Sequence, residues 1–600
     1  MSSDLDLNPF SVQSPERIAA HDVLSLFVED FADFHQIHRA GHTFLHGARG
    51  SGKSMIFRFL EPDCQILKKK CPLNELDFFA FYIPIKEMEV KLTELIRLEM
   101  DGHGSLPLNE HLMTVNIVLK MFASLERITQ SGEPPEETTA FRNFISDTLV
   151  RLLKRGGWAG VVPEIPAEGS FEQYRLVAVS LLEEVYSEIS LFIQRLSLGG
   201  CLIYTGTLLG FKDFVRPVCA ALRSMPFMPA TKPFFLLVDD ADNFSEEQTR
   251  ILNTWVSSRG TAEISLKIST QRRYKTFRTI SGQSIETPHD FSEVEISDIY
   301  TSDRDRYMAR VESIVERRLQ LASINATPST FFPEDHKQEN EIAKIAESLR
   351  ATWSESGRGF RANDDAYRYA RPNFIRGLHG SSKSGSTYSY AGFKQLVHIS
   401  SGVVRYFLEP AALMYGEQTA ANEGSAPVTA IAPHIQNKVT REQANRFLTS
   451  EFERIVREDG NLGGGDRATK LRNLLDSLGA LFSHILMSDA AERRVFSVAF
   501  SNGPDDEVRE IFELGTEYNY LHKSSIGKKE GAGRTALYIL SRRLAPAFGL
   551  DPTSFAGYKF ITNEVARMMM LEPKKFHNRL RTNHIDSVVD PAQGRLFEEN

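Results

Sequence analysis

The sequence predicts an α/β protein built around a parallel β-sheet, and three segments indicate this fold. Thr43–Leu45 is a short apolar stretch that leads through a glycine-rich loop into a helical apolar pattern. Phe234–Val238 are five consecutive apolar residues, which suit a strand buried on both faces of a parallel sheet. After a predicted helix at Glu246–Ser258, the segment Glu263–Thr270 alternates apolar and polar side chains, as a third strand does. A last core strand is predicted within Asp290–Ile299.

The chain has 600 residues, more than one hydrophobic core usually organises, so several domains are expected. Hydrophobic residues make up 42% and charged residues 25%, an ordinary balance for a folded protein. The formal net charge of −8 argues against a protein that coats nucleic acid over its whole surface. The start lacks a basic region followed by an apolar core, and no apolar run of about 18 residues follows. We therefore expect a cytoplasmic protein without membrane contact, whose reduced thiols are Cys64, Cys71, Cys201 and Cys219.

The glycine-rich loop has the spacing G-x-x-x-x-G-K-S, which is typical of a loop that binds nucleotide phosphates. Glycines let the backbone bend around the phosphates, and the following helix directs its positive end toward them. Lys53 is expected to reach the β and γ phosphates of ATP, and Ser54 to give its hydroxyl to Mg²⁺, which prefers oxygen ligands. The predicted cofactors are therefore ATP and Mg²⁺. The predicted nucleotide-binding residues are Gly47, Ala48, Arg49, Gly50, Ser51, Gly52, Lys53 and Ser54.

Such a loop needs a second strand that ends in a carboxylate, and the strand at Phe234–Val238 is followed by two aspartates. We assign Asp239 to the magnesium shell and Asp240 to orienting the hydrolytic water, because neighbouring strand residues point to opposite sides. Alternatively, Asp240 or Asp242 caps the helix that begins near Ser245, and for Asp242 this is the favoured interpretation.

The third strand ends in two hydroxyl side chains. We predict that Thr270 contacts the γ-phosphate or its attacking water, with Ser269 as the second candidate. The alternative is that these residues only end the strand.

This order of motifs resembles the AAA+ class of P-loop ATPases. Within it the chain resembles the bacterial ATPases grouped with the origin-recognition and replication-initiator branch, most closely over Asn8–Asp63. The segment SGVVRYFLEPA, at Ser401–Ala411, is similar to the lid-helix motif in which an arginine senses the nucleotide. The resemblance implies this role for Arg405, whose always-charged planar fork can grip a phosphate. Alternatively, Arg405 is a surface residue that pairs with Glu409 one turn later.

The resemblance also implies a homo-oligomer in which an arginine from a neighbouring subunit reaches the nucleotide. Arg272, Arg273 and Arg278 are the candidates, and the alternative is a solvated basic face. AAA+ hydrolases usually carry glutamate where Asp240 stands, so slow hydrolysis is expected from the shorter side chain. An Asp-Asp pair is also common in signal-transduction ATPases of the immune-receptor type.

The predicted domains are an ATPase core at 1–300, a helical lid at 301–416, a linker at 417–440 and a carboxyl-terminal domain at 441–600. The core is interrupted by an insertion at about 86–228, whose apolar residues recur at helical spacing. Arg304–Leu321 is predicted as a helix that enters the lid. The polar segment Arg376–Tyr390 is predicted as a loop because it lacks the apolar content to pack a core.

The carboxyl-terminal domain is predicted to contain helices at Arg446–Val456 and Ala468–Ser488, followed by a winged helix. Gly527–Arg534 is the predicted wing and Thr535–Ser541 its return strand. Between residues 519 and 585, twelve lysines and arginines stand against four acidic residues, an excess that could bind DNA phosphates. The candidates are Lys523, Lys528, Lys529, Arg534, Arg542 and Arg543. Alternatively, these charges are solvated and the domain contacts proteins.

The sequence thus predicts an AAA+ ATPase that acts as an ATP-dependent switch of initiator type and engages DNA or a partner effector protein. The resemblance implies a role in mobile-element biology or antiviral defence. The alternative function is that of a signal-transduction P-loop ATPase, which senses a protein partner without binding DNA.

Overall fold

A computed structural model describes the protein over residues 8–29, 34–87, 105–130, 138–197, 203–258, 262–271, 274–296, 304–356, 362–380, 387–422, 427–461, 466–488, 494–500, 503–527, 533–553 and 557–582. The chain forms two compact units, Gln13–Asp298 and a second one that combines Met1–Val12 with Ile299–Asn600. Residues 8–12 therefore belong to the second unit, whereas the sequence analysis assigned them to the core. Of the four cysteines, Cys64, Cys71 and Cys219 are free thiols, and Cys201 lies outside the described residues.

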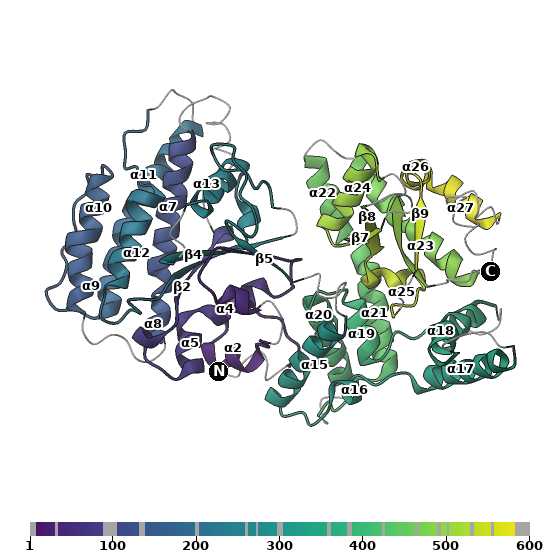
Figure 1. The fold of residues 1–600 in the computed structure, drawn as a ribbon. Helices are drawn as coiled ribbons and strands as arrows, with labels where there is room; N and C mark the ends of the chain where they lie inside the picture. Colours follow the sequence, from purple (N-terminus) through teal and green to yellow (C-terminus); the bar gives the residue numbers. More distant parts are fainter. Residues whose placement is uncertain are drawn as a thin grey trace. The chain divides into compact units, whose positions relative to one another are not determined.

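The first unit contains a five-stranded parallel sheet, which confirms the predicted α/β core (Figure 1). Its order is β2-β3-β4-β1-β5, so β4 lies between β1 and β3. The strands are β1(Thr43–His46), β2(Phe79–Pro84), β3(Phe234–Asp239), β4(Ile264–Thr270) and β5(Ser292–Glu295). The sequence analysis did not identify β2, although Phe79, Phe81 and Ile83 are buried in the core.

Helices cover both faces of this sheet (Figure 1). One face carries α2(Ala20–Leu26), α4(Lys53–Leu60) and α5(Pro62–Lys69), and the other carries α7(Ser105–Ser124), α11(Phe171–Ser197) and α13(Glu246–Val256). The smaller elements are η1(Pro15–Arg17), α3(Phe34–Ile37), η2(Leu73–Glu75), η3(Ile85–Glu87), α8(Glu126–Gln130), α9(Thr139–Asn143), η4(Phe144–Leu149), α10(Val150–Arg155), η5(Phe211–Val215), α12(Arg216–Arg223) and η6(Ala241–Asn243). The elements from α7 to α12 form the predicted helical insertion. They share one hydrophobic core with the sheet, in which Leu236, Met121 and Leu182 are buried together.

The second unit is mostly helical and contains a four-stranded mixed sheet of order β7-β8-β6-β9. Its strands are β6(Val495–Phe500), β7(Leu521–Gly527), β8(Arg534–Leu540) and β9(Gly557–Ile561). Its helices are α15(Arg304–Leu321), α16(Pro328–Phe331), α17(His336–Ser356), α18(Ala362–Gly380), α19(Phe393–Ile399), α20(Arg405–Ala421), α21(Pro433–Leu448), α22(Phe452–Asn461), α23(Asp466–Met487), α24(Asp506–Glu517), η7(Arg542–Leu544), α25(Ala545–Phe548), α26(Asn563–Leu571) and α27(Pro573–Arg581). Strands β7 and β8 pair antiparallel on either side of the predicted wing, and β6 and β9, which the sequence analysis missed, extend that hairpin into a sheet.

The predicted loop Arg376–Tyr390 is wrong at its beginning, and its end, although irregular in backbone, packs in a core where none was expected. Residues 376–380 complete α18, and Tyr388 and Tyr390 are buried in the carboxyl-terminal core. The hydroxyl of Tyr388 donates to Oε1 of Gln395 at 2.9 Å and accepts from Nη1 of Arg371 at 2.7 Å. Because the tyrosine hydroxyls find such partners, a segment of polar composition can be buried.

The predicted linker and the predicted helix that follows it also need correction. The region 417–440 contains the end of α20 and the beginning of α21. The helix predicted at Arg446–Val456 is two helices, because α21 ends at Leu448 and α22 begins at Phe452. Thr449 separates them, with φ −116° and ψ −90°, outside the helical region.

A buried ion pair joins α4 to α5. The guanidinium of Arg58 donates to both carboxylate oxygens of Asp63, at 2.8 Å and 2.6 Å, and both residues are almost completely buried. Burying two charges costs solvation free energy, and this cost is offset only while the pair stays intact. The turn between the two helices therefore depends on this contact.

We predict that Asp63→Asn lowers the free energy of unfolding by about 3 kcal/mol, because it leaves the Arg58 charge buried without its bidentate partner. Urea denaturation of the full chain measures the change. Arg250→Ala is the matched control, since it removes an exposed pair with Glu246 and should cost less than about 1 kcal/mol. Equal effects of the two substitutions would contradict the importance of the buried pair.

Candidate nucleotide-binding site

The glycine-rich loop leaves the carboxyl end of β1 and enters α4. Gly50 and Gly52 adopt φ angles of +88° and +104°, which residues with a Cβ atom rarely adopt. The backbone N–H of Gly47 donates to the carbonyl of Thr270 at 3.2 Å, which fixes the beginning of the loop to the end of β4. The loop thus turns back over the carboxyl edge of the sheet and ends at a helix N-terminus, where anions are favoured.

Lys53 folds back over the loop that precedes it. Its ammonium donates to the carbonyl oxygens of Gly47 at 2.7 Å and Ala48 at 3.2 Å, and its side chain is buried. Burial lowers the pKa of Lys53, while the carboxylates of Asp240 and Asp239 act in the opposite direction. These interactions place the lysine in the electrostatic field of the acids that follow β3.

Two hydroxyl groups of the loop fit a phosphate and a metal ion. Ser51 is buried, and its Oγ has no hydrogen-bond partner among the described residues. A buried hydroxyl without a partner is costly, so a phosphate oxygen at this position would satisfy it. Ser54 is half-buried in the first turn of α4, next to Lys53. The donor set of the loop therefore fits a polyphosphate.

Asp239 is the last residue of β3 and is 2% exposed. Its Oδ1 accepts from the hydroxyl of Ser269 and, at 3.1 Å, from the backbone N–H of Asp240. Its Oδ2 accepts from the hydroxyl of Tyr82 at 2.9 Å. Both oxygens are therefore fixed by donors, as expected for a carboxylate that must present a lone pair to a cation in one direction. The sequence analysis missed Tyr82 because it did not recognise β2.

Asp240 adopts a left-handed backbone conformation, with φ +57° and ψ +43°, immediately after β3. Burial raises the pKa of its carboxyl group, and the neighbouring carboxylates of Asp239 and Asp242 raise it further, against the lowering effect of Lys53. A backbone in a sparsely populated region together with a raised carboxyl pKa is common at catalytic positions.

The interpretation of Asp242 as a helix cap is wrong. Ser245 caps α13 by accepting from the backbone N–H of Gln248, whose side chain returns the bond to the backbone of Ser245. Asp242 instead accepts from the backbone N–H and the side-chain amide of Gln271, at 3.1 Å and 2.9 Å. It therefore fixes the chain that leaves β4.

Thr270 and Ser269 point toward different neighbours. The Thr270 hydroxyl donates to the carbonyl of Gln271 at 2.8 Å, so its single proton is used and it accepts from Nδ1 of His46 at 2.7 Å. Ser269 contacts Asp239 directly, as described above. Burial lowers the pKa of His46 to about 4, helped by Lys53. A neutral His46 thus holds Thr270, and the sequence analysis did not identify this histidine.

Comparison with known proteins identifies the family of this chain. The model of the family described as ORC-CDC6-like matches residues 8–560. The chain belongs to the ORC-CDC6-like family. A solved structure described as Cdc6p from Pyrobaculum aerophilum is similar with 8% identity and a TM-score of 0.27, covering 95% of this chain and 97% of that one. No curated protein matches the chain.

Membership of the ORC-CDC6-like family confirms the resemblance to the origin-recognition and initiator branch. Across the described parts of the chain, every helix is too short or too polar to span a membrane. Nor do three His, Cys, Asp or Glu side chains converge on a preformed metal site in those parts. This finding is compatible with a magnesium ion that is held mainly by phosphate oxygens and one or two protein ligands.

The arginines implied by the family resemblance remain predictions. Arg405 opens α20 in the second unit, where its Nε lies 3.8 Å from Oε1 of Glu409. That ion pair is the contact of the alternative interpretation, and such a partly exposed pair contributes little stability. Arg278 is exposed in the first unit, whereas Arg272 and Arg273 lie outside the described residues.

Two of the predicted DNA-binding residues have other partners. Arg542 and Arg543 are only 2% and 6% exposed, so their inclusion among the phosphate-binding candidates is wrong. Arg543 donates to both carboxylate oxygens of Glu451, at 2.9 Å and 2.7 Å. Lys523 and Arg534 are exposed on β7 and β8, and Lys528 and Lys529 lie outside the described residues.

We predict that Asp240→Asn stabilises the nucleotide-free protein at pH 7 by on the order of 1 kcal/mol. The pKa of Asp240 in the folded protein lies above its unfolded value of about 3.9. The stability contributed by the protonated carboxyl group is therefore fully present at pH values below the unfolded pKa. This contribution is lost as the pH rises through the raised pKa, whereas an amide cannot ionise. Urea denaturation at pH 7 and at pH 4 should show a gain that shrinks at the lower pH.

Asp242→Asn is the matched control for this measurement. It removes a hydrogen-bonded carboxylate, so it should lower the stability by about 1 kcal/mol. A loss of stability in Asp240→Asn at pH 7 would show that the ionised carboxylate is favourable in the folded protein.

Proposed function

We propose that this chain binds ATP with Mg²⁺ and hydrolyses it slowly, acting as a nucleotide-dependent switch. The observation that carries this proposal is the geometry at the carboxyl edge of the sheet, where buried Lys53 folds back over the carbonyls of the glycine-rich loop and buried Asp239 ends β3. The phosphate-binding loop, the buried acids and the hydroxyl-ended third strand occur in the order expected of the family.

In this proposal the amides of the loop bind the β and γ phosphates, and Lys53 exchanges its carbonyl partners for phosphate oxygens. Ser54 and Asp239 would hold the magnesium ion. ATP with Mg²⁺ supplies the electrophilic phosphorus and the cleavable phosphoanhydride bond. Asp240 orients the attacking water and accepts its proton, a task that suits a carboxyl group with a raised pKa.

The remaining groups would report the state of the nucleotide. Thr270, whose hydroxyl contacts His46, would contact the γ-phosphate or the water. Arg405 would act as the lid sensor, and Arg272, Arg273 or Arg278 would complete the site of a neighbouring subunit in a homo-oligomer. Arginine is suited to both tasks because its charge is permanent and its donors form a planar fork.

We predict that Lys53→Ala lowers ATP affinity at least about 100-fold, because it removes the ammonium that the glycine-rich loop holds for the phosphates. Asp240→Asn should retain ATP affinity and lose at least about 100-fold in turnover. Equilibrium binding of a fluorescent ATP analogue and a phosphate-release assay measure the two effects. Retained affinity in Lys53→Ala would overturn the nucleotide site, and unchanged turnover in Asp240→Asn would remove it as the residue that orients the water.

The switch is further proposed to engage DNA through the β7–β8 hairpin, which would serve as the wing of a winged-helix domain. Lys523 and Arg534 lie on adjacent antiparallel strands of this hairpin, and Lys528 and Lys529 stand between these strands in the sequence. Their side chains are exposed, and Arg534 is oriented by two 2.7 Å bonds to Ser525. A role in mobile-element biology or antiviral defence is the context that the family resemblance implies.

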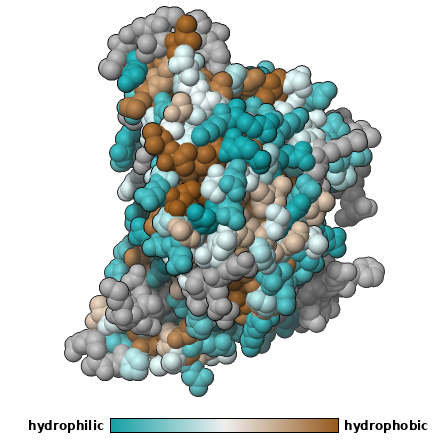
Figure 2. Space-filling view, turned by 90° about the vertical axis from the view of Figure 1, so that its left-hand side faces the viewer, coloured by the Kyte–Doolittle hydropathy of each residue, from teal (hydrophilic) through white to brown (hydrophobic). Residues whose placement is uncertain are grey.

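The second candidate function is a switch that senses a protein partner without binding DNA. Burial of Arg542 and Arg543 favours it, because it removes two of the charges that suggested DNA binding. The insertion also exposes large apolar residues, Val161, Leu176, Leu191, Ile203 and Leu208. Figure 2 shows apolar side chains among hydrophilic ones on the side of the molecule where the insertion lies.

Salt-dependent DNA binding by the full chain separates the two candidates. We predict that the Lys523→Ala, Arg534→Ala double variant reduces the slope of log K against log salt by about two, since each residue neutralises about one phosphate. Lys344→Ala, an exposed lysine on α17, should leave the slope unchanged. Absence of DNA binding at low salt would favour the protein-sensing function.

A further inference from the structure

Tyr82 lies between two carboxylates, one of which is the proposed magnesium ligand. Its hydroxyl oxygen is 2.9 Å from Oδ2 of Asp239 and 3.0 Å from Oε1 of Glu16. Tyr82 pairs with Leu237 in the register of β2 and β3, so its side chain and that of Asp239 lie on the same face of the sheet. The contact therefore follows from the regular geometry of two adjacent strands.

The hydroxyl has one proton for two acceptors. A phenol hydroxyl beside two carboxylates donates its proton to one of them. A single proton can serve only one carboxylate oxygen at a time. The other carboxylate oxygen then lies next to the phenol oxygen without a proton between them. A cation beside Asp239 would stabilise this arrangement.

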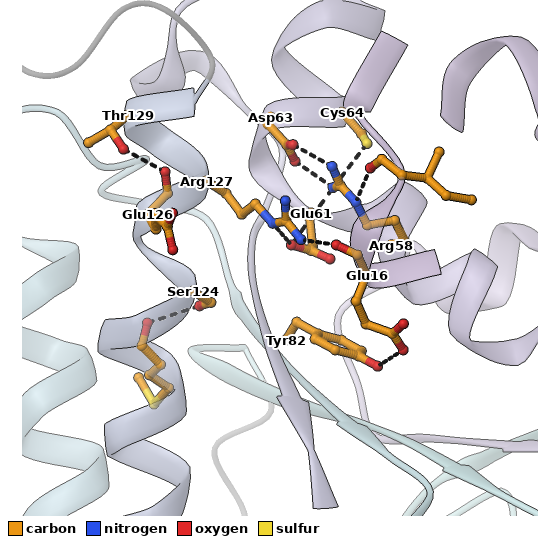
Figure 3. A network of polar contacts seen from close by, with 12 residues as sticks. Glu16, Arg58, Glu61, Asp63, Cys64, Tyr82, Ser124, Glu126, Arg127 and Thr129 are labelled. Carbon is orange, nitrogen blue, oxygen red and sulfur yellow. Dashed lines mark hydrogen bonds and ion pairs between the residues drawn. The ribbon is translucent and has the colours of Figure 1, made fainter. Parts of the chain in front are cut away.

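Glu16 is held from the other side by the helical insertion (Figure 3). Arg127 of α8 donates from Nη2 to the backbone carbonyl of Glu16 at 2.7 Å, and from Nε to Oε2 of Glu61 at 2.9 Å. Glu61 is 2% exposed, and Arg58 of α4 donates from its Nε to the carbonyl of Ile18 at 3.2 Å. Arg127 from the insertion and Arg58 from α4 thus fix the segment that carries Glu16.

The insertion also contacts α13, on the other face of the sheet. The side-chain amide of Gln248, which completes the cap of α13, donates to Oδ1 of Asn109 on α7 at 3.0 Å. Asn109 and Gln248 are both fully buried. Helix α13 follows the acidic turn after β3, so α7 supports the chain that leaves Asp239, while α8 supports the segment of Glu16.

We propose that Tyr82 is a positioning residue for the magnesium ligand Asp239, and that the insertion supports it through Arg127 and Glu16. The proposal rests on the proposed function. It gives the insertion, in which the sequence shows no chemistry, a role in metal binding. Partners of metal ligands typically change metal affinity by about 10–100-fold when they are removed.

The test is a magnesium titration of ATP hydrolysis by the full chain. Tyr82→Phe keeps the ring and removes the hydroxyl, so the Mg²⁺ concentration for half-maximal rate should rise about 10-fold, while saturating Mg²⁺ restores the rate. ATP binding in the presence of EDTA should not change. A structural defect alone would lower the rate at every Mg²⁺ concentration, and that outcome would overturn the proposal.

Arg127→Met provides a second variant, expected to shift the magnesium dependence in the same direction by a smaller factor. Arg142→Met is its matched control, because Arg142 also lies on the insertion but bonds only to the carbonyl of Pro166 in the described contacts. Unchanged magnesium dependence in both Tyr82→Phe and Arg127→Met would refute the inference. The proposed function would still stand in that case, provided that Lys53→Ala abolishes ATP binding.

Discussion

The candidate site depends on one constraint, the burial of an ammonium beside carboxylates at the end of a parallel sheet. Strand β4 lies between the strand of the loop and the strand of the acids, and its last two residues bond to different sides. The hydroxyl of Ser269 bonds to the carboxylate of Asp239. The hydroxyl of Thr270 bonds to Nδ1 of His46, and its carbonyl accepts from the backbone N–H of Gly47. The end of β4 therefore sets the distance between Lys53 and the acids.

The sequence could predict the parts of the site that depend on near neighbours in the chain. Glycine spacing, an apolar run and an acidic end are local patterns, and they located β1, β3 and β4 correctly. Tyr82, Glu16 and His46 could not be found in this way. Their roles depend on the order of the strands, which brings residues more than 150 positions apart into contact. The aromatic run at β2 was the available indication of Tyr82.

Charge counting failed in the carboxyl-terminal domain for a related reason. A count treats every arginine as solvated, but a guanidinium can also be buried when its plane is stacked and its donors are paired. Arg543 lies 4.4 Å from the ring centre of Tyr406 and 4.1 Å from that of Phe447, and it is paired with Glu451. These partners lie far from Arg543 in the sequence, so a count of charged residues does not reveal them.

The two buried arginines also connect two parts of the second unit that lie far apart in the sequence. The backbone N–H of Arg542 donates to Oγ of Ser401 at 2.8 Å, in the turn before α20, and Arg543 stacks on Tyr406, the neighbour of Arg405. The start of α20 is thus fixed to the segment that follows β8. If Arg405 binds a phosphate as proposed, the contacts at Ser401 and Tyr406 would link the position of α20 to the segment that follows β8. Allosteric coupling requires an element that both sites bias, and the start of α20 would be that element in the proposed switch.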